Sequence, residues 1–111
     1  MENQKNKFPA AEVTSVVNAV EYADGSVVSR TVIDGKAGTV TLFAFDSGEG
    51  LSEHTAPFDA LVQVLDGSAK ISVGGDTHTV SSGEMLLMPA DVPHALRAEE
   101  RFKMLLIMIR G

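Results

Sequence analysis

GEGLSEHTAPFDALVQVLDG, at residues 48–67, and GEMLLMPADVPHALRA, at residues 83–98, are the stretches that decide the fold of this 111-residue chain. Each begins with a glycine and contains one histidine, His54 in the first and His94 in the second. Gly67 and Gly83 stand where turns call for a positive φ, which glycine adopts at no steric cost. Prolines ahead of His94 predict a loop there, because a residue without an N–H does not belong inside a ladder.

The rest of the chain reads as strand, turn, strand. Turn signals rich in Asp, Gly and Ser recur about every ten residues, which is typical of a sandwich or closed barrel. No long amphipathic helix separates the strands, so a parallel α/β sheet is not expected. The predicted strands are residues 26–33, 39–45, 60–65, 69–73, 77–80, 85–88 and 103–109.

The N-terminal part of the chain differs in character. Residues 1–7 are polar and are predicted to be a flexible tail, with residues 8–111 forming a single domain. Val13, Val16, Val17 and Val20 follow helical spacing, which predicts a short helical turn that ends near Tyr22.

The two deciding stretches resemble the paired motifs of the cupin superfamily, G-x5-H-x-H-x3,4-E-x6-G and G-x5-P-x-G-x2-H-x3-N. The spacing is complete, but alanine replaces two ligand positions of the first motif, at Ala56 and Ala60. In the second motif Asp91 replaces a glycine and Ala98 the asparagine. The resemblance implies an all-β fold, the cupin-type double-stranded β-helix, which is an antiparallel jelly-roll barrel.

The resemblance also implies a divalent metal ion in the barrel mouth, held in the family by three histidines and one glutamate. Only His54 and His94 carry over, and two imidazoles alone anchor Mn, Fe, Ni or Zn weakly. Asp59 is the candidate third metal ligand. Strand parity points Asp59 away from Ala60's side, although a bulge at 57–58 would re-aim its carboxylate and give a two-histidine, one-carboxylate site suited to Fe(II).

A second hypothesis places His54 and His94 as polar side chains in an otherwise apolar cavity, bonded to each other, to water or to a small molecule. Ala56 and Ala60 then enlarge and dry the cavity, which favours an apolar or aromatic ligand. A third hypothesis is a subunit or sensor that acts through its dimer surface. His78 is expected at the surface, and Met85, Met88, Met104 and Met108 are expected to fill the core.

The composition and charge of the chain limit the kinds of molecule that the protein is expected to bind. The net charge of −6 and the pI near 4.9 oppose binding to nucleic acid or to anionic membranes. The absence of cysteine excludes disulfides and thiolate metal sites. The polar N-terminus and the lack of a long apolar run predict a cytoplasmic protein. Strands 27–33 and 60–65 carry apolar residues on both faces, so a homodimer is expected, as the resemblance also implies.

Overall fold

The computed structural model describes residues 8–110, so the predicted tail at residues 1–7 lies outside the described residues. Within this range the chain forms one short 3₁₀ helix, Val16–Asn18, and eight strands. The strands are β1 (Val27–Gly35), β2 (Gly38–Phe45), β3 (Gly50–His54), β4 (Asp59–Val73), β5 (Asp76–Ser81), β6 (Met85–Met88), β7 (His94–Arg97) and β8 (Phe102–Ile109). No helix of the described residues is long and apolar enough to cross a membrane.

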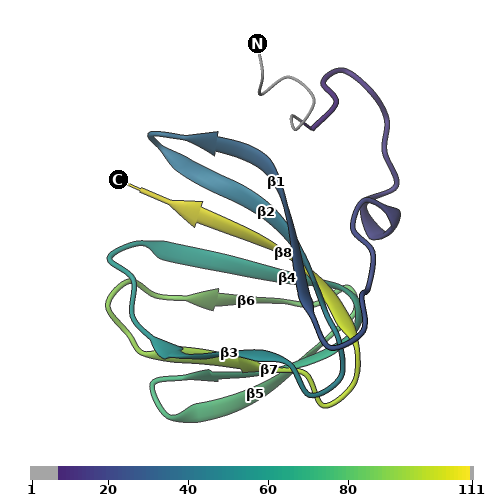
Figure 1. Ribbon diagram of the computed structural model, residues 1–111. Coiled ribbons are helices and arrows are strands. Elements are labelled where there is room, and N and C mark those ends of the chain that lie inside the picture. Colours follow the sequence, from purple (N-terminus) through teal and green to yellow (C-terminus); the bar gives the residue numbers. More distant parts are fainter. Residues whose placement is uncertain (1–7, 111) are drawn as a thin grey trace.

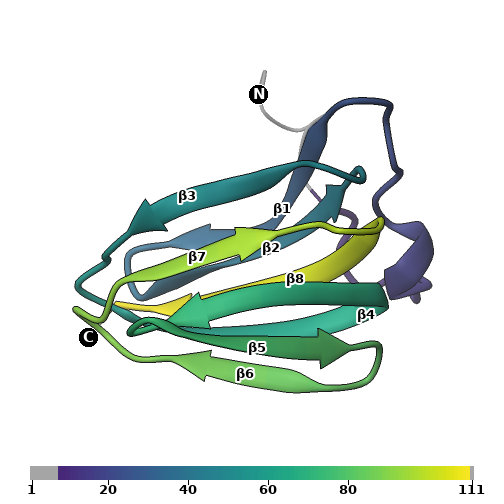
Figure 2. The same cartoon turned by 90° about the horizontal axis from the view of Figure 1, so that it is seen from below.

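The strands form two antiparallel layers that curl toward each other (Figures 1 and 2). One layer has the order β1-β2-β8-β4-β6, and the other has the order β3-β7-β4-β5. Strand β4 belongs to both layers and joins them. This arrangement confirms the predicted all-β antiparallel barrel.

Strand β4 changes layer in its middle. Residues 59–67 pair with β8 and β6, and residues 68–73 pair with β5 and β7. The sequence predicted two strands separated by an Asp66–Gly67 turn, which is wrong, because the chain continues as one strand through a register shift between Val64 and Asp66. Gly67 has φ of 71° there, and a Cβ on it would collide with the Arg101 carbonyl oxygen.

The core lies between the layers and is built from alternate residues of each strand. Phe45 on β2 faces Phe102 on β8, and their rings stack with centroids 4.5 Å apart. Burying one such side chain contributes about 1.5–3 kcal/mol. The other fully buried large side chains are Leu42, Ile71, Met104, Val62 and Val64, of which Leu42 faces outward beneath the N-terminal segment.

Two strands were not predicted. Strands β3 and β7 are five and four residues long, and their sequences GLSEH and HALR mix polar and apolar residues. The N-terminal helical turn is shorter than predicted: it covers Val16–Asn18 and ends well before Tyr22. Valine's stiff branched side chain disfavours the longer helix that the spacing suggested.

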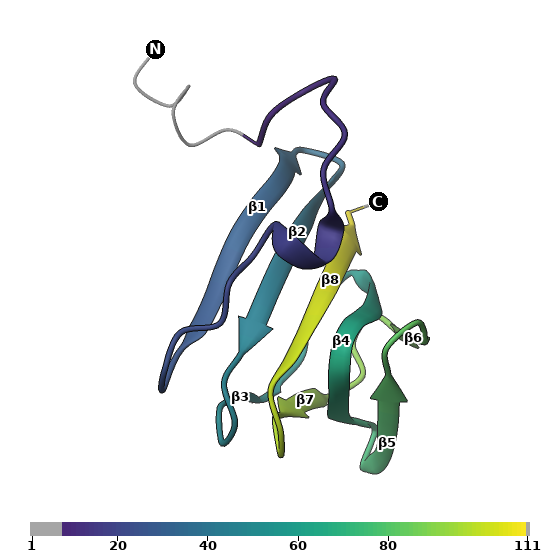
Figure 3. The same cartoon turned by 90° about the vertical axis from the view of Figure 1, so that its right-hand side faces the viewer.

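The N-terminal segment crosses the outer face of the first layer (Figure 3). Ala19 and Val20 are buried there against Leu42 and Ala44 of β2. Lys103, only 6% exposed, donates a hydrogen bond of 2.6 Å from Nζ to the Val17 carbonyl oxygen. The segment therefore covers one part of an apolar sheet face and leaves the rest open.

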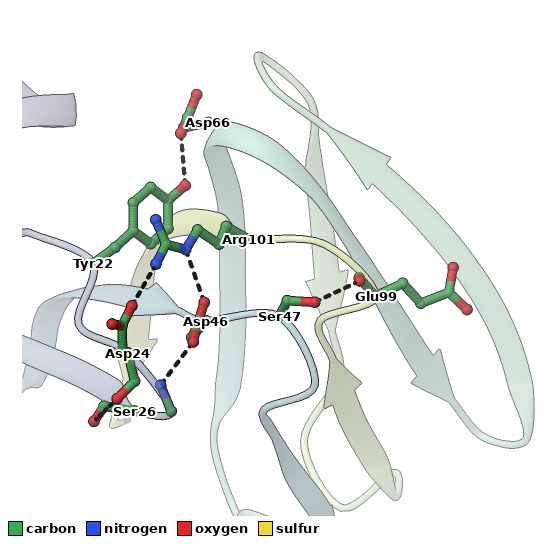
Figure 4. A network of polar contacts seen from close by, with 9 residues as sticks. Tyr22, Asp24, Ser26, Asp46, Ser47, Asp66, Glu99 and Arg101 are labelled. Atoms are coloured by element: carbon green, nitrogen blue, oxygen red, sulfur yellow. Dashed lines mark hydrogen bonds and ion pairs between the residues drawn. The ribbon is translucent and has the colours of Figure 1, made fainter.

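A polar network fixes the chain between this segment and the barrel (Figure 4). Arg101 donates to the carboxylates of Asp46, at 2.8 Å, and Asp24, at 2.9 Å. The Arg101 hydrogen bond, together with backbone N–H donors, lowers the pKa of Asp46 to about 2. Tyr22 donates its hydroxyl proton to Asp66 at 2.6 Å, and burial together with that carboxylate raises the pKa of Tyr22.

Replacing Gly67 by alanine should destabilise the fold strongly. Gly67→Ala combines a left-handed backbone with a collision against backbone, so we expect the free energy of unfolding to fall by more than about 3 kcal/mol. Gly75→Ala is the matched control, because Gly75 has φ of 92° but no atom within 4 Å of an added Cβ. We expect the control to cost only about 1–2 kcal/mol. Urea unfolding followed by circular dichroism measures both, and equal losses would contradict the role given to Gly67.

Candidate functional site

The two motif histidines come from neighbouring strands of the second layer. His54 is the last residue of β3, and His94 is the first residue of β7. The two strands pair antiparallel with His54 directly opposite His94, beyond a register shift that begins at Leu51. His54 is exposed, whereas His94 is only 5% exposed. The pair therefore runs from the rim of a cavity into its interior.

The imidazole rings meet through their Nε2 atoms, which lie 3.1 Å apart. The ring centroids are 4.3 Å apart and the ring planes are inclined at 71°, so the rings meet at an angle rather than end to end. Each Nδ1 lies beside a backbone carbonyl oxygen two residues earlier, that of Ser52 at 2.8 Å and that of Val92 at 3.2 Å. A carbonyl oxygen only accepts, so each of these two contacts is a hydrogen bond in the tautomer that carries its proton on Nδ1.

This hydrogen bonding determines what the two Nε2 atoms can do. A neutral imidazole carries one proton, and the carbonyl contacts assign that proton to Nδ1 in both rings. In this assignment each Nε2 presents a lone pair, and the two Nε2 atoms lie 3.1 Å apart on rings that are inclined to each other. Two acceptors attract each other only through a third species, such as a shared proton, a hydrogen-bond donor of a ligand, or a metal ion.

The histidines open into a cavity of about 50 Å³ between the layers. Ala56 and Ala60, which stand at the altered ligand positions of the first motif, line the same cavity. All four ligand positions of the motif therefore converge on one space, and two of them carry methyl groups. The remaining lining residues are apolar: Leu51, Met88, Leu96, Met104, Leu106 and Met108.

Asp59 does not join the histidines. It is exposed, and its Oδ1 accepts a hydrogen bond of 2.9 Å from the Ala90 backbone N–H. Its neighbour Ala60 faces the cavity, as strand parity predicts, and the irregularity of β4 lies at Val64–Asp66 rather than at 57–58. Among residues 8–110, no three His, Cys, Asp or Glu side chains gather closely enough to hold a metal ion.

The loop that carries His94 is fixed from both sides. Asp91, at the position of the motif glycine, has φ of 65°, a left-handed conformation that Asp tolerates better than most residues. Its backbone N–H donates to the Ala56 carbonyl oxygen at 2.8 Å. The Pro93 carbonyl oxygen accepts from the Gly74 N–H at 2.8 Å. The two motifs are thus hydrogen-bonded to each other beside the cavity.

The third histidine and the four predicted core methionines fall into two groups. His78 is exposed on β5 and Met85 is 69% exposed on β6, and neither lines the cavity. Met88, Met104 and Met108 do line it. The prediction that all four methionines fill the core is wrong for Met85, and it is confirmed for Met88 and Met104, which belong to the buried core, with Met108 packed against it.

Comparison with known proteins agrees with this architecture. A family model described as "Cupin domain" matches residues 41–110. A protein of unknown function from Streptococcus pyogenes has a similar structure, with 34% identity, coverage of 94% of this chain and 91% of its own, and a TM-score of 0.90. A cupin 2 conserved barrel domain protein from Leptotrichia buccalis has 44% identity and a TM-score of 0.83, over 85% of this chain and 46% of its own.

A third similar structure, a cupin superfamily protein from Desulfitobacterium hafniense, has 26% identity, coverage of 96% of both chains and a TM-score of 0.85. The search of curated proteins gives no match. A two-layer antiparallel barrel with one histidine-lined cavity defines the structural class. The matched residues then identify the chain as a member of the cupin family.

The metal centre that the family implies does not fit this cavity. Mn²⁺, Fe²⁺ and Ni²⁺ are held by several nitrogen and oxygen ligands, at least one of them commonly a carboxylate. The cavity supplies two imidazoles and no carboxylate, because Ala60 stands at the glutamate position and Asp59 bonds elsewhere. His54 and His94 alone leave most of the coordination sphere of such an ion unfilled.

Proposed function

We propose that this cupin is a small-molecule binding protein whose ligand enters the cavity beside His54 and His94. The observation that carries the proposal is the pair of Nε2 atoms that face each other at 3.1 Å while both Nδ1 atoms donate to backbone carbonyls. A ligand O–H or N–H placed beside the pair donates its proton to one of these Nε2 lone pairs.

The shape of the cavity favours a ligand with a polar end and an apolar body. A volume of about 50 Å³ accommodates little more than the polar end of an organic molecule. The apolar body then lies at the mouth, against Leu51 and Met108 of the lining. Burying apolar surface there contributes about 25 cal/mol for each Å² removed from water. A phenol or a small aromatic acid has both features.

A second candidate function is a metal-dependent cupin enzyme of the dioxygenase or isomerase type. It has in its favour that the two Nε2 atoms lie 3.1 Å apart, close enough to bind one shared ion. It requires at least one further protein ligand, and Asp59 would have to leave the Ala90 N–H to provide it. The donor set therefore supports the binding protein better than the enzyme.

We further propose that the chain forms a homodimer through the outer face of the first layer. Five outward-facing apolar residues lie side by side across five strands, each paired with the next: Ile33, Val40, Ile107, Leu61 and Leu87. We call this row the apolar stripe. At its two ends Ile33 is 60% and Leu87 is 56% exposed. A second copy matches the stripe because a two-fold axis places one apolar row against another.

Phenol and toluene provide a matched test of the binding site. Phenol has the hydrogen-bond donor that the histidine pair lacks, so we expect toluene to bind at least about tenfold more weakly. Titration followed by the imidazole ¹H–¹⁵N signals of His54 and His94 measures both affinities. The His54→Ala/His94→Ala variant should bind phenol and toluene equally, and His78→Ala should behave as wild type. Equal binding of the two compounds to wild type would overturn the proposal.

Light scattering at micromolar concentration tests the dimer. The wild type should have the mass of two chains, since a stable interface buries about 1,200–2,000 Å² and the stripe spans the whole sheet. Ile107→Lys puts a charge at the centre of the stripe and should give a monomer. His78→Lys adds the same charge at an exposed site on the other layer and should remain dimeric. A monomeric wild type would show that the stripe is not a dimer interface.

A further inference from the structure

The histidine cavity contains sulfur as well as nitrogen donors. Three methionines line it, Met88 from β6 and Met104 and Met108 from β8. Met88 is 2% exposed and Met104 is not exposed. A thioether is a soft, neutral and weak ligand that suits soft metal ions. Two imidazoles and three thioethers therefore share one space that contains no carboxylate.

Strand register brings two of these methionines beside the altered ligand position. Ala60 on β4 lies directly opposite Met88 on one neighbouring strand and directly opposite Met108 on the other. Side chains directly opposite each other in an antiparallel pair have Cβ atoms about 4.5–5.5 Å apart. Two flexible thioethers thus flank the site where the motif has its glutamate, and the alanine methyl leaves them room.

The histidine pair is arranged like a pair of metal ligands. Histidines that bind metals commonly donate their other ring N–H to a backbone carbonyl or carboxylate, and both rings do so here through Nδ1. With metal–nitrogen bonds of about 2.0–2.1 Å, two ligands at roughly 90–110° are separated by about 2.8–3.4 Å. The observed separation of the Nε2 atoms is 3.1 Å.

Charge decides which kind of ion this donor set suits. Neutral imidazoles and thioethers contribute no negative charge, so a bound ion keeps its full charge in an apolar cavity. The cost of burying an ion rises steeply with its charge, which favours a monovalent ion over a divalent one. Soft thioethers combined with imidazole select Cu(I), whereas Mn²⁺ and Fe²⁺ prefer harder oxygen ligands.

We propose that the cavity is a Cu(I) site, in which His54 and His94 bind through Nε2 and Met88 and Met108 supply the sulfur. This inference goes beyond the proposed function, since it gives the same cavity a second kind of occupant, which competes with an organic ligand for the two Nε2 atoms. It differs from the metal centre that the family implies in both ligands and ion. In this interpretation alanine replaces two hard ligands of the motif, and soft methionine side chains flank one of these positions, Ala60.

Anaerobic titration with Cu(I) in competition with bicinchoninate tests the site. Wild type should bind one Cu(I) per chain, and His54→Ala/His94→Ala should lose it. Met88→Leu/Met108→Leu conserves the core volume and should weaken Cu(I) binding by tenfold or more. Met85→Leu changes an exposed methionine and should match wild type. X-ray absorption at the copper edge should show nitrogen and sulfur together in the first shell.

Three results would overturn the Cu(I) site. They are an unchanged affinity in Met88→Leu/Met108→Leu, a copper shell without sulfur, and tighter binding of Mn(II) or Zn(II) than of Cu(I) to wild type. The phenol titration of the copper-free protein separates this inference from the proposed function. Phenol binding without Cu(I) binding refutes only the copper site, and loss of both refutes the cavity as a binding site.

Discussion

The passage of β4 from one layer to the other is the constraint on which the rest of the barrel depends. This one strand pairs with β5, β6, β7 and β8, so it fixes the distance between the layers and the register of both. The passage requires a left-handed residue at Gly67, where the Arg101 carbonyl leaves no space for a side chain. The stability of the fold and the geometry of the site therefore both depend on the backbone conformation of Gly67.

The cavity is held at both ends of the same strand. Near its start, Ala60 lies between Met88 and Met108, and at its end Val73 pairs with His94. His94 in turn faces His54 across β7 and β3. The two imidazoles are then locked by their own strands through the Ser52 and Val92 carbonyls. The site is thus preorganised, and in the assigned tautomers both Nε2 atoms are acceptors for an occupant.

The architecture could be predicted from the sequence because the spacing of glycine, proline and histidine indicates where the turns lie and how long the strands between them are. It misread β4 because Asp-Gly is a strong hairpin signal, and only the distant Arg101 carbonyl explains Gly67 inside a strand. It missed β3 and β7, which are short and partly polar, so that pairing with neighbours rather than local propensity makes them strands.

The site was recovered only in part, for the same reason. The motif register predicted that His54 and His94 meet, but the candidate third ligand Asp59 bonds to the Ala90 N–H outside the cavity lining, on the side that parity gave it. The tautomers are assigned from the positions of backbone carbonyls, and the placement of the thioethers depends on the register of three strands. Neither can be deduced from the amino-acid sequence. The position of Met88 and Met108 beside Ala60 is therefore information that only the folded sheet contains.

The tautomers of His54 and His94 test the central claim most directly, because every proposed occupant depends on two facing Nε2 lone pairs. Two-bond ¹H–¹⁵N correlation spectra of the metal-free protein, recorded where both rings are neutral, report which nitrogen carries the proton. The account predicts a protonated Nδ1 and an unprotonated Nε2 in both rings. A proton on Nε2 of either ring would mean that the histidines simply hydrogen-bond to each other, and would contradict the account.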